Sequence, residues 1–128
     1  MPSNISSKNA PTPAGHYSQA IVYGGLVYVS GQLPVDPATG AKCTGSIEDQ
    51  TQLALENVAA ILEAAGSGVD RVLKTTVYVS DISSWPQVND VYSRFFGSHR
   101  PARVVVPTRD LHFGLKVEVE VVAALVER

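Results

Sequence analysis

The stretch IEDQTQLALENVAAILEAAG, residues 47–66, holds the first long helix pattern of the chain and decides the fold. Its apolar residues recur at spacings of one, three or four, which is typical of an amphipathic helix. Ser46 is suited to cap its start and Gly66 to end it. Glu48 and Asp49 lie in the first turn, where negative charges interact favourably with the helix dipole. We therefore predict a helix of about five turns, with an inner face formed by Ile47, Thr51, Ala54, Leu55, Val58, Ile61, Leu62 and Ala65.

Strand patterns lie on both sides of this helix. Before it, IVYGGLVYVS (residues 21–30) predicts two strands joined by a tight hairpin at Gly24 and Gly25. After it, three more segments have the apolar, β-branched composition of strands. These segments are RVLKTTVYVS (71–80), ARVVVPT (102–108) and LKVEVEVVAALV (115–126).

A second helix is expected between the first two of these later strands. Ser83 or Ser84 can cap it, and its first turn tolerates Pro86. Its predicted inner face consists of Trp85, Val88, Tyr92 and Phe95. The element order is therefore β-β-α-β-α-β-β, which predicts an α+β fold in a single domain over residues 1–128. Residues 1–15, rich in Pro, Ser, Asn and Ala, are expected to form a lead-in loop.

The predicted sheet needs a cover on both faces. Two helices are enough for one face, yet LVYV (26–29), VVV (104–106) and VVAALV (121–126) are apolar at successive positions. Such runs are typical of strands with two apolar faces. A second copy of the chain is the simplest cover for the face without helices. We therefore expect a homo-oligomer.

Composition narrows the class of protein. The chain has 128 residues, 45% of them hydrophobic and 17% charged, against roughly 25% charged in an average domain. A net charge of −2 gives no general attraction to nucleic acid or anionic membranes, and no segment has the length of a membrane span or a signal core. We expect a soluble, cytoplasmic protein. The single cysteine, Cys43, lies in a polar, turn-like segment, which favours a passive thiol over a reactive one.

Seven short motifs follow one another along the chain in the order of a known family. They are GHYSQA (15–20), YVSGQLPVDPATG (28–40), QTQLALENVAAILEAAG (50–66), VLKTTVYVSDI (72–82), VNDVYSRFF (88–96), PAR (101–103) and VEVEVVA (117–123). With these motifs the chain resembles the YjgF–RidA family of enamine/imine deaminases. The resemblance covers nearly the whole chain after residue 15.

This resemblance implies a chorismate-mutase-like α+β fold that assembles as a homotrimer. The three sheets would form an inner barrel with the helices outside, and ligand clefts would lie between neighbouring subunits. The implied activity is hydrolysis of 2-aminoacrylate and related enamines or imines to a 2-keto acid and ammonia. The family needs no metal or organic cofactor for this reaction.

Arg103 and Glu118 are the candidate catalytic residues. A guanidinium fork binds a carboxylate through two parallel hydrogen bonds, and the resemblance gives this role to Arg103. In KVEVEVV, Glu118 and Glu120 point to one face of the strand and the valines to the other. The resemblance implies that Glu118 orients and polarises the attacking water, and burial could raise its pKa for proton exchange. The alternative for Arg103 is a surface ion pair at a strand end, and the alternative for Glu118 is a solvated strand edge.

Further ligand contacts are predicted around these two residues. By resemblance, Tyr17 closes over the ligand, Ser30 and Gly31 approach it, and Asn89 lies near the cleft. Glycine permits such a close approach because it has no side chain. Ser30 is no nucleophile candidate, since no G-x-S-x-G motif surrounds it. Tyr17 at a strand start and Asn89 on a helix face have purely structural alternatives.

Other kinds of site find little support in the sequence. His16, His99 and His112 lack metal-site spacing, and Cys43 has no paired cysteine, so no metal site is predicted. A nuclease-like activity has also been ascribed to the family. The chain has no basic strip interleaved with aromatic residues, so we expect no nucleic-acid partner.

The chain departs from the family pattern around the expected cleft. Val104 and Val105 stand where the family places Ser or Thr and then Cys or a small residue, and Leu111-His112 replaces a Leu-Pro pair. The loop before PAR is also shorter than usual. Val105 would make the substrate pocket more apolar. Two alternatives therefore stay open: a non-catalytic protein that binds 2-keto acids, and a deaminase of another substrate such as 2-aminomuconate.

Overall fold

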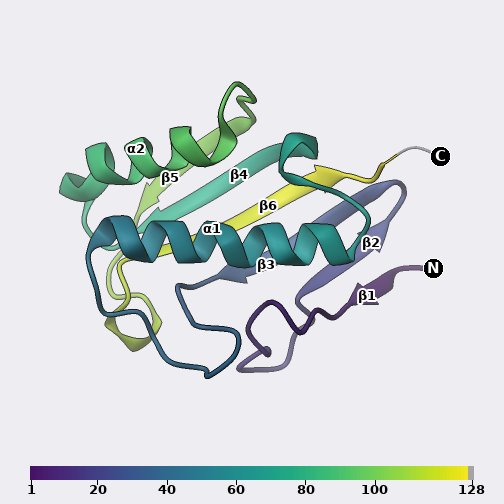
Figure 1. Ribbon diagram of the computed structural model, residues 1–128, viewed down its shortest axis with the longest axis horizontal. Helices are drawn as coiled ribbons and strands as arrows, with labels where there is room; N and C mark the ends of the chain where they lie inside the picture. Colours follow the sequence, from purple (N-terminus) through teal and green to yellow (C-terminus); the bar gives the residue numbers. More distant parts are fainter. Residues whose placement is uncertain (127–128) are drawn as a thin grey trace.

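The computed structural model describes residues 1–126 and shows one mixed, six-stranded sheet with two helices on one face (Figure 1). The predicted α+β fold is confirmed. Strands β4 and β5 are parallel, and the other neighbours are antiparallel in the order β1-β2-β3-β6-β4-β5. The elements are β1 (Ser3–Ile5), β2 (Ala20–Tyr23), β3 (Leu26–Gln32), α1 (Ile47–Ala64), β4 (Val72–Val79), α2 (Trp85–Phe96), β5 (Ala102–Pro107) and β6 (Val117–Ala124), with short 3₁₀ turns at Val69–Arg71, Ile82–Ser84 and His112–Gly114.

Helix α1 begins and ends where the sequence predicts. The Ser46 hydroxyl accepts a hydrogen bond from the backbone N–H of Asp49 at 3.1 Å, which caps the first turn. Gly66, with φ +84°, has the left-handed conformation that commonly follows the last helical turn. The predicted inner face of α1 is buried except at its two ends, where Ile47 and Ala65 are only partly buried.

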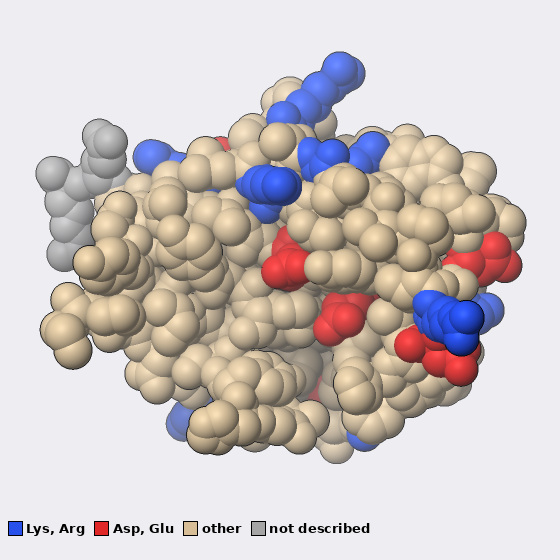
Figure 2. Space-filling model, turned by 180° about the vertical axis from the view of Figure 1, so that it is seen from behind, with Lys and Arg blue, Asp and Glu red and all other residues tan. Residues whose placement is uncertain are grey.

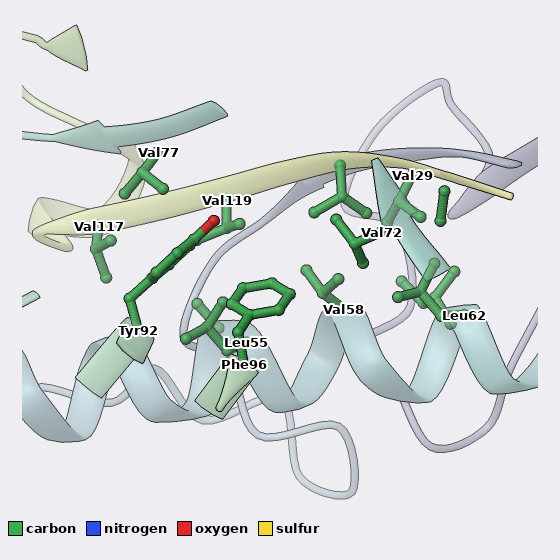
Figure 3. Packing of buried hydrophobic residues seen from close by; sticks show 14 of the residues in the cluster. Val29, Leu55, Val58, Leu62, Val72, Val77, Tyr92, Phe96, Val117 and Val119 are labelled. Atoms are coloured by element: carbon green, nitrogen blue, oxygen red, sulfur yellow. The ribbon is translucent and has the colours of Figure 1, made fainter. Parts of the chain in front are cut away.

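The core lies between the helices and the sheet (Figure 3). Val117 and Val119 of β6 are fully buried there, so the intervening Glu118 points to the opposite face. The inner face of α2 differs from the prediction. Val88 and Tyr92 are buried as expected. Trp85 and Phe95 are only partly buried, and the other buried residues of α2 are Val91 and Phe96.

The amino-terminal segment is more ordered than a lead-in loop. Residues Ser3–Ile5 form the edge strand β1, which pairs antiparallel with β2. The prediction missed this strand because its three residues are too few to show an alternating pattern. The hairpin at Gly24 and Gly25 is as predicted: both have positive φ, and Tyr23 pairs with Leu26 across a two-residue turn.

The sheet face without helices is a mixed surface (Figure 2). Tyr28 and Val104 are exposed on this face. Tyr28 stands between the buried residues Val27 and Val29 of β3, and Val104 pairs with Thr76 of β4. Tyr78, Glu118 and Glu120 lie on the same face, where the Tyr78 hydroxyl donates a hydrogen bond to Glu120. This face therefore combines apolar area with ionisable groups.

Candidate active site

Glu118 lines a cavity of about 450 Å³ on the face of the sheet that carries no helix. We call it the glutamate cavity. Its walls come from four parts of the chain: the segment before β2, the end of β3 with the residues that follow it, the turn before β6, and β6 itself. Its lining consists of Ala14, Gly15, Tyr17, Ser30, Gly31, Leu33, His112, Phe113 and Glu118.

A β-bulge at the end of β3 places Gly31 against Glu118. Val29 pairs with Val121 and Gln32 with Val119, so β3 has one more residue than β6 between these pairs. A Cβ atom on Gly31 would lie only 2.6 Å from Oε2 of Glu118. A side chain at position 31 would have to displace this carboxylate, so glycine lets the backbone of β3 lie against Glu118.

The environment of Glu118 shifts its protonation equilibrium toward the neutral carboxyl group. Burial raises the pKa of this carboxyl above its ordinary value, and the negative charge of Glu120 adds to the effect. His112 acts in the opposite direction on the same pKa. A carboxyl group with a raised pKa beside a cavity is suited to accept and return a proton.

Tyr17 and Ser30 are held in place by hydrogen bonds to the backbone. The Tyr17 hydroxyl accepts from the N–H of Ala14 at 3.2 Å, which folds the ring back over the cavity. The Ser30 hydroxyl donates to the carbonyl oxygen of Ser18 at 2.7 Å. Because the Ser30 proton is engaged, this hydroxyl can only accept a hydrogen bond from a ligand.

Arg103 lies in a different cavity, between α2 and the start of β5. This arginine cavity has a volume of about 440 Å³. The Arg103 guanidinium is 4.5 Å from the ring centre of Trp85 and 4.6 Å from that of Tyr92. Its Nη1 donates to Oδ1 of Asn89 at 3.1 Å. The lining consists of Asn89, Tyr92, Ser93, Phe96, Gly97, His99, Arg100, Pro101 and Arg103.

These contacts orient the guanidinium before any ligand arrives. The two aromatic rings pack against the guanidinium, and the bond to Asn89 uses one of its five N–H groups. Asn89 therefore helps to orient Arg103 through this hydrogen bond. Tyr92 is anchored in turn, because its hydroxyl shares a hydrogen bond of 2.8 Å with the Thr75 hydroxyl. Figure 3 shows Tyr92 reaching from α2 toward the sheet.

A single chain does not bring all the predicted site residues together. Arg103 is in register with the buried Thr75, so it lies on the face that α2 covers, whereas Glu118 lies on the opposite face. Tyr17, Ser30 and Gly31 join Glu118; Asn89 joins Arg103. Val105 packs against the core and lines neither the glutamate cavity nor the arginine cavity.

Sequence reasoning missed the partners of Arg103. Trp85 and Tyr92 were expected only as inner-face residues of a helix, but both stack on the guanidinium. Their spacing contained the information, since Trp85, Asn89 and Tyr92 are four and three residues apart and so share one helix face. The spacing alone does not reveal the site, because the site also needs β5 to place Arg103 beside this helix face.

Within residues 1–126, no cluster of three or more His, Cys, Asp or Glu side chains is arranged to hold a metal ion. No helix in the same described part is both long and apolar enough to cross a membrane. Cys43 is a partly buried free thiol.

Replacing Gly31 by alanine tests the contact between β3 and Glu118. The added Cβ must displace the carboxylate, because the two would otherwise overlap. We expect ligand binding or turnover at this cavity to fall at least about ten-fold, since displacement by about 1 Å has large effects in a site. Circular dichroism and thermal melting should remain close to those of the parent chain. Unchanged kinetics in a folded variant would show that this carboxylate position is unimportant.

Fold and site together define a small α+β domain with a half-buried glutamate on one face of its sheet and, on the other, an exposed arginine that packs on two aromatic rings of α2. A family model, Endoribonuclease L-PSP, matches residues 7–125. The chain belongs to this family, which is the YjgF–RidA family that its motifs resemble.

Curated relatives and solved structures agree with this assignment. The chain is 45% identical to a RutC family protein of Pyrococcus horikoshii, covering 93% of this chain and 94% of the relative. It is 42% identical to the 2-iminobutanoate/2-iminopropanoate deaminase of Salmonella typhimurium, covering 96% and 98%. Its structure is similar to that of Escherichia coli TdcF with bound serine, at a TM-score of 0.92 and 37% identity, covering 97% and 99%.

Proposed function

We propose that this protein hydrolyses enamine and imine intermediates of the 2-aminoacrylate type to 2-keto acids and ammonia. The observation that carries the proposal is Glu118, a half-buried carboxyl with a raised pKa that lines a cavity beside Gly31. Relatives at about 40% identity that are named 2-iminobutanoate/2-iminopropanoate deaminase support this activity class.

The reaction needs one water and one group that moves protons. An enamine first takes a proton at its terminal carbon and becomes the imine. Glu118 accepts a proton from the attacking water while the oxygen forms a bond to the imine carbon. Glu118 then gives this proton to the nitrogen of the carbinolamine, the C–N bond breaks, and ammonia leaves. As the C=O bond forms, the hydroxyl proton passes to water, which balances the proton added to the enamine carbon. The carboxyl of Glu118 ends in its starting state, and no oxidant or cofactor enters the balance.

Arg103 has the chemistry to hold the substrate carboxylate. A guanidinium stacked on Trp85 and Tyr92 and bonded to Asn89 loses little conformational freedom when it binds an anion. Bidentate binding to a carboxylate would fix the orientation of the adjacent imine carbon.

A second copy of the chain completes the site in this proposal. Glu118 and Arg103 lie on opposite faces of the sheet within one chain, so a small ligand cannot touch both there. The face that carries Glu118 also exposes apolar area that a neighbouring subunit can cover. We propose a homotrimer in which the arginine cavity of one subunit faces the glutamate cavity of the next.

The test is competition for an imine generated in situ. An amino-acid oxidase produces the 2-imino acid, semicarbazide traps it, and the protein should lower the yield of semicarbazone while 2-keto acid and ammonia appear. Calorimetric titration with 2-oxobutanoate runs beside this assay. Binding without acceleration, across several imino acids, would favour the non-catalytic alternative, and neither binding nor acceleration would reject both.

A further inference from the structure

A second cavity adjoins the glutamate cavity. This loop cavity, of about 380 Å³, lies between the segment before β2 and the loop that follows β3. It shares Ala14, Tyr17, Gly31, Leu33 and Phe113 with the glutamate cavity, and Lys42 also lines it. The two spaces are therefore neighbours with a common wall, and Gly31 at that wall has no side chain to separate them.

Phe113 is the unusual residue of this wall. It has φ +62°, and it is the only non-glycine residue with positive φ in the described part of the chain. An aromatic residue in this conformation costs stability, and such strain is concentrated at functional sites. Its ring is held by a charge, because the Lys42 ammonium lies 4.5 Å from the ring centre.

The charge of Lys42 is directed at this space by the loop that carries it. Lys42 forms an isolated antiparallel bridge with Val35, which fixes the end of the loop beside Phe113. Asp36 also lines the cavity. Its Oδ1 accepts hydrogen bonds from the N–H groups of Ala38 and Thr39, which stabilise the turn. The loop cavity thus combines an apolar wall with one cationic side chain, Lys42, and one acidic side chain, Asp36, that is hydrogen-bonded to the turn.

We propose that the loop cavity binds the distal carboxylate of a dicarboxylic 2-imino acid, with Lys42 as its counter-ion. The inference rests on the proposed function, because it places the imine carbon at Glu118. The carbon chain passes over Gly31, the Phe113 ring covers its methylene groups, and the terminal carboxylate reaches Lys42. The protein therefore prefers imines with an acidic side chain to imines with an apolar side chain of the same length.

The matched substrates are the imines of glutamate and norvaline, which have the same number of carbon atoms and differ in the terminal carboxylate. We expect kcat/KM to be higher for the glutamate imine. Lys42→Met should lower the ratio of the two kcat/KM values about ten-fold, because one charge-assisted contact is lost while the stem still packs on Phe113. Lys42→Glu should lower it further, and added salt should weaken the preference of the parent chain.

Lys8→Met is the control, since Lys8 is exposed and lines neither cavity. It should keep the parent ratio. Equal kcat/KM for both imines in the parent chain, or an unchanged ratio in Lys42→Met, would overturn the inference even if both imines are hydrolysed. In that case the proposed function stands and only the acidic preference is rejected.

A binding measurement tests the acidic subsite independently of catalysis. Calorimetric titration with 2-oxoglutarate and 2-oxopentanoate uses stable keto acids with the same difference at the terminal group. Tighter binding of 2-oxoglutarate, lost in Lys42→Met, would support the acidic subsite even if no imine were hydrolysed. Equal binding of the two keto acids would contradict it.

Discussion

Arg103→Lys should lower kcat/KM for a 2-imino acid by about 100-fold or more. An ammonium group provides one compact charge and cannot form the two parallel hydrogen bonds of a guanidinium fork. It also loses the stacking on Trp85 and Tyr92 that orients the fork. The measurement is steady-state kinetics in the semicarbazide competition assay.

Arg109→Lys is the matched control, because Arg109 is exposed and does not line the arginine cavity. It should remain within about two-fold of the parent chain, as expected for a surface substitution. If Arg103→Lys also stayed within this range, Arg103 would not be the carboxylate anchor.

Glu118→Gln should lower kcat by about 100-fold to 10,000-fold, the range expected for loss of a general acid–base group. Glutamine has nearly the same shape but cannot accept a proton from water. The pH profile gives a second readout. Because the pKa of Glu118 is raised, the active carboxylate form is lost on acidification at a higher pH than for an ordinary glutamate. Activity should therefore fall on the acid side, and Glu118→Gln should abolish that limb.

Glu120→Gln provides the internal comparison on the same strand face. It retains an oxygen that can accept from Tyr78 but removes a negative charge that raises the pKa of Glu118. The acid limb should therefore move to lower pH while most of kcat is retained. A larger loss of kcat in Glu120→Gln than in Glu118→Gln would exchange the roles of the two carboxylates.

Local patterns predicted most of the fold. The stripe of α1, its Ser46 cap and the double-glycine hairpin depend on neighbouring residues, so the sequence contains them directly. The alternation in β6 likewise predicted that Glu118 shares a face with Glu120. Strand β1 was missed because it is held by pairing with β2 and not by a pattern of its own.

The site was harder to predict because it depends on contacts between distant segments. A bulge in β3 aligns Gly31 with Glu118; a glycine within a strand suggests a bulge but does not give the register that results. The side of the sheet that Arg103 faces follows from the parallel pairing of β5 with β4. The left-handed conformation of Phe113 is equally invisible, since the residue is bulky and no glycine stands at its position.

A mixed assembly of two inactive chains tests the central claim most directly. Arg103→Lys and Glu118→Gln chains are mixed in equal amounts, unfolded and refolded together. We expect about one quarter of the parent number of active sites, because random assembly pairs an intact Arg103 with an intact Glu118 in that fraction of clefts. The semicarbazide competition assay should show this recovery, while each variant refolded alone stays inactive. Activity of the mixture equal to the mean of the two variants would contradict a site shared between subunits.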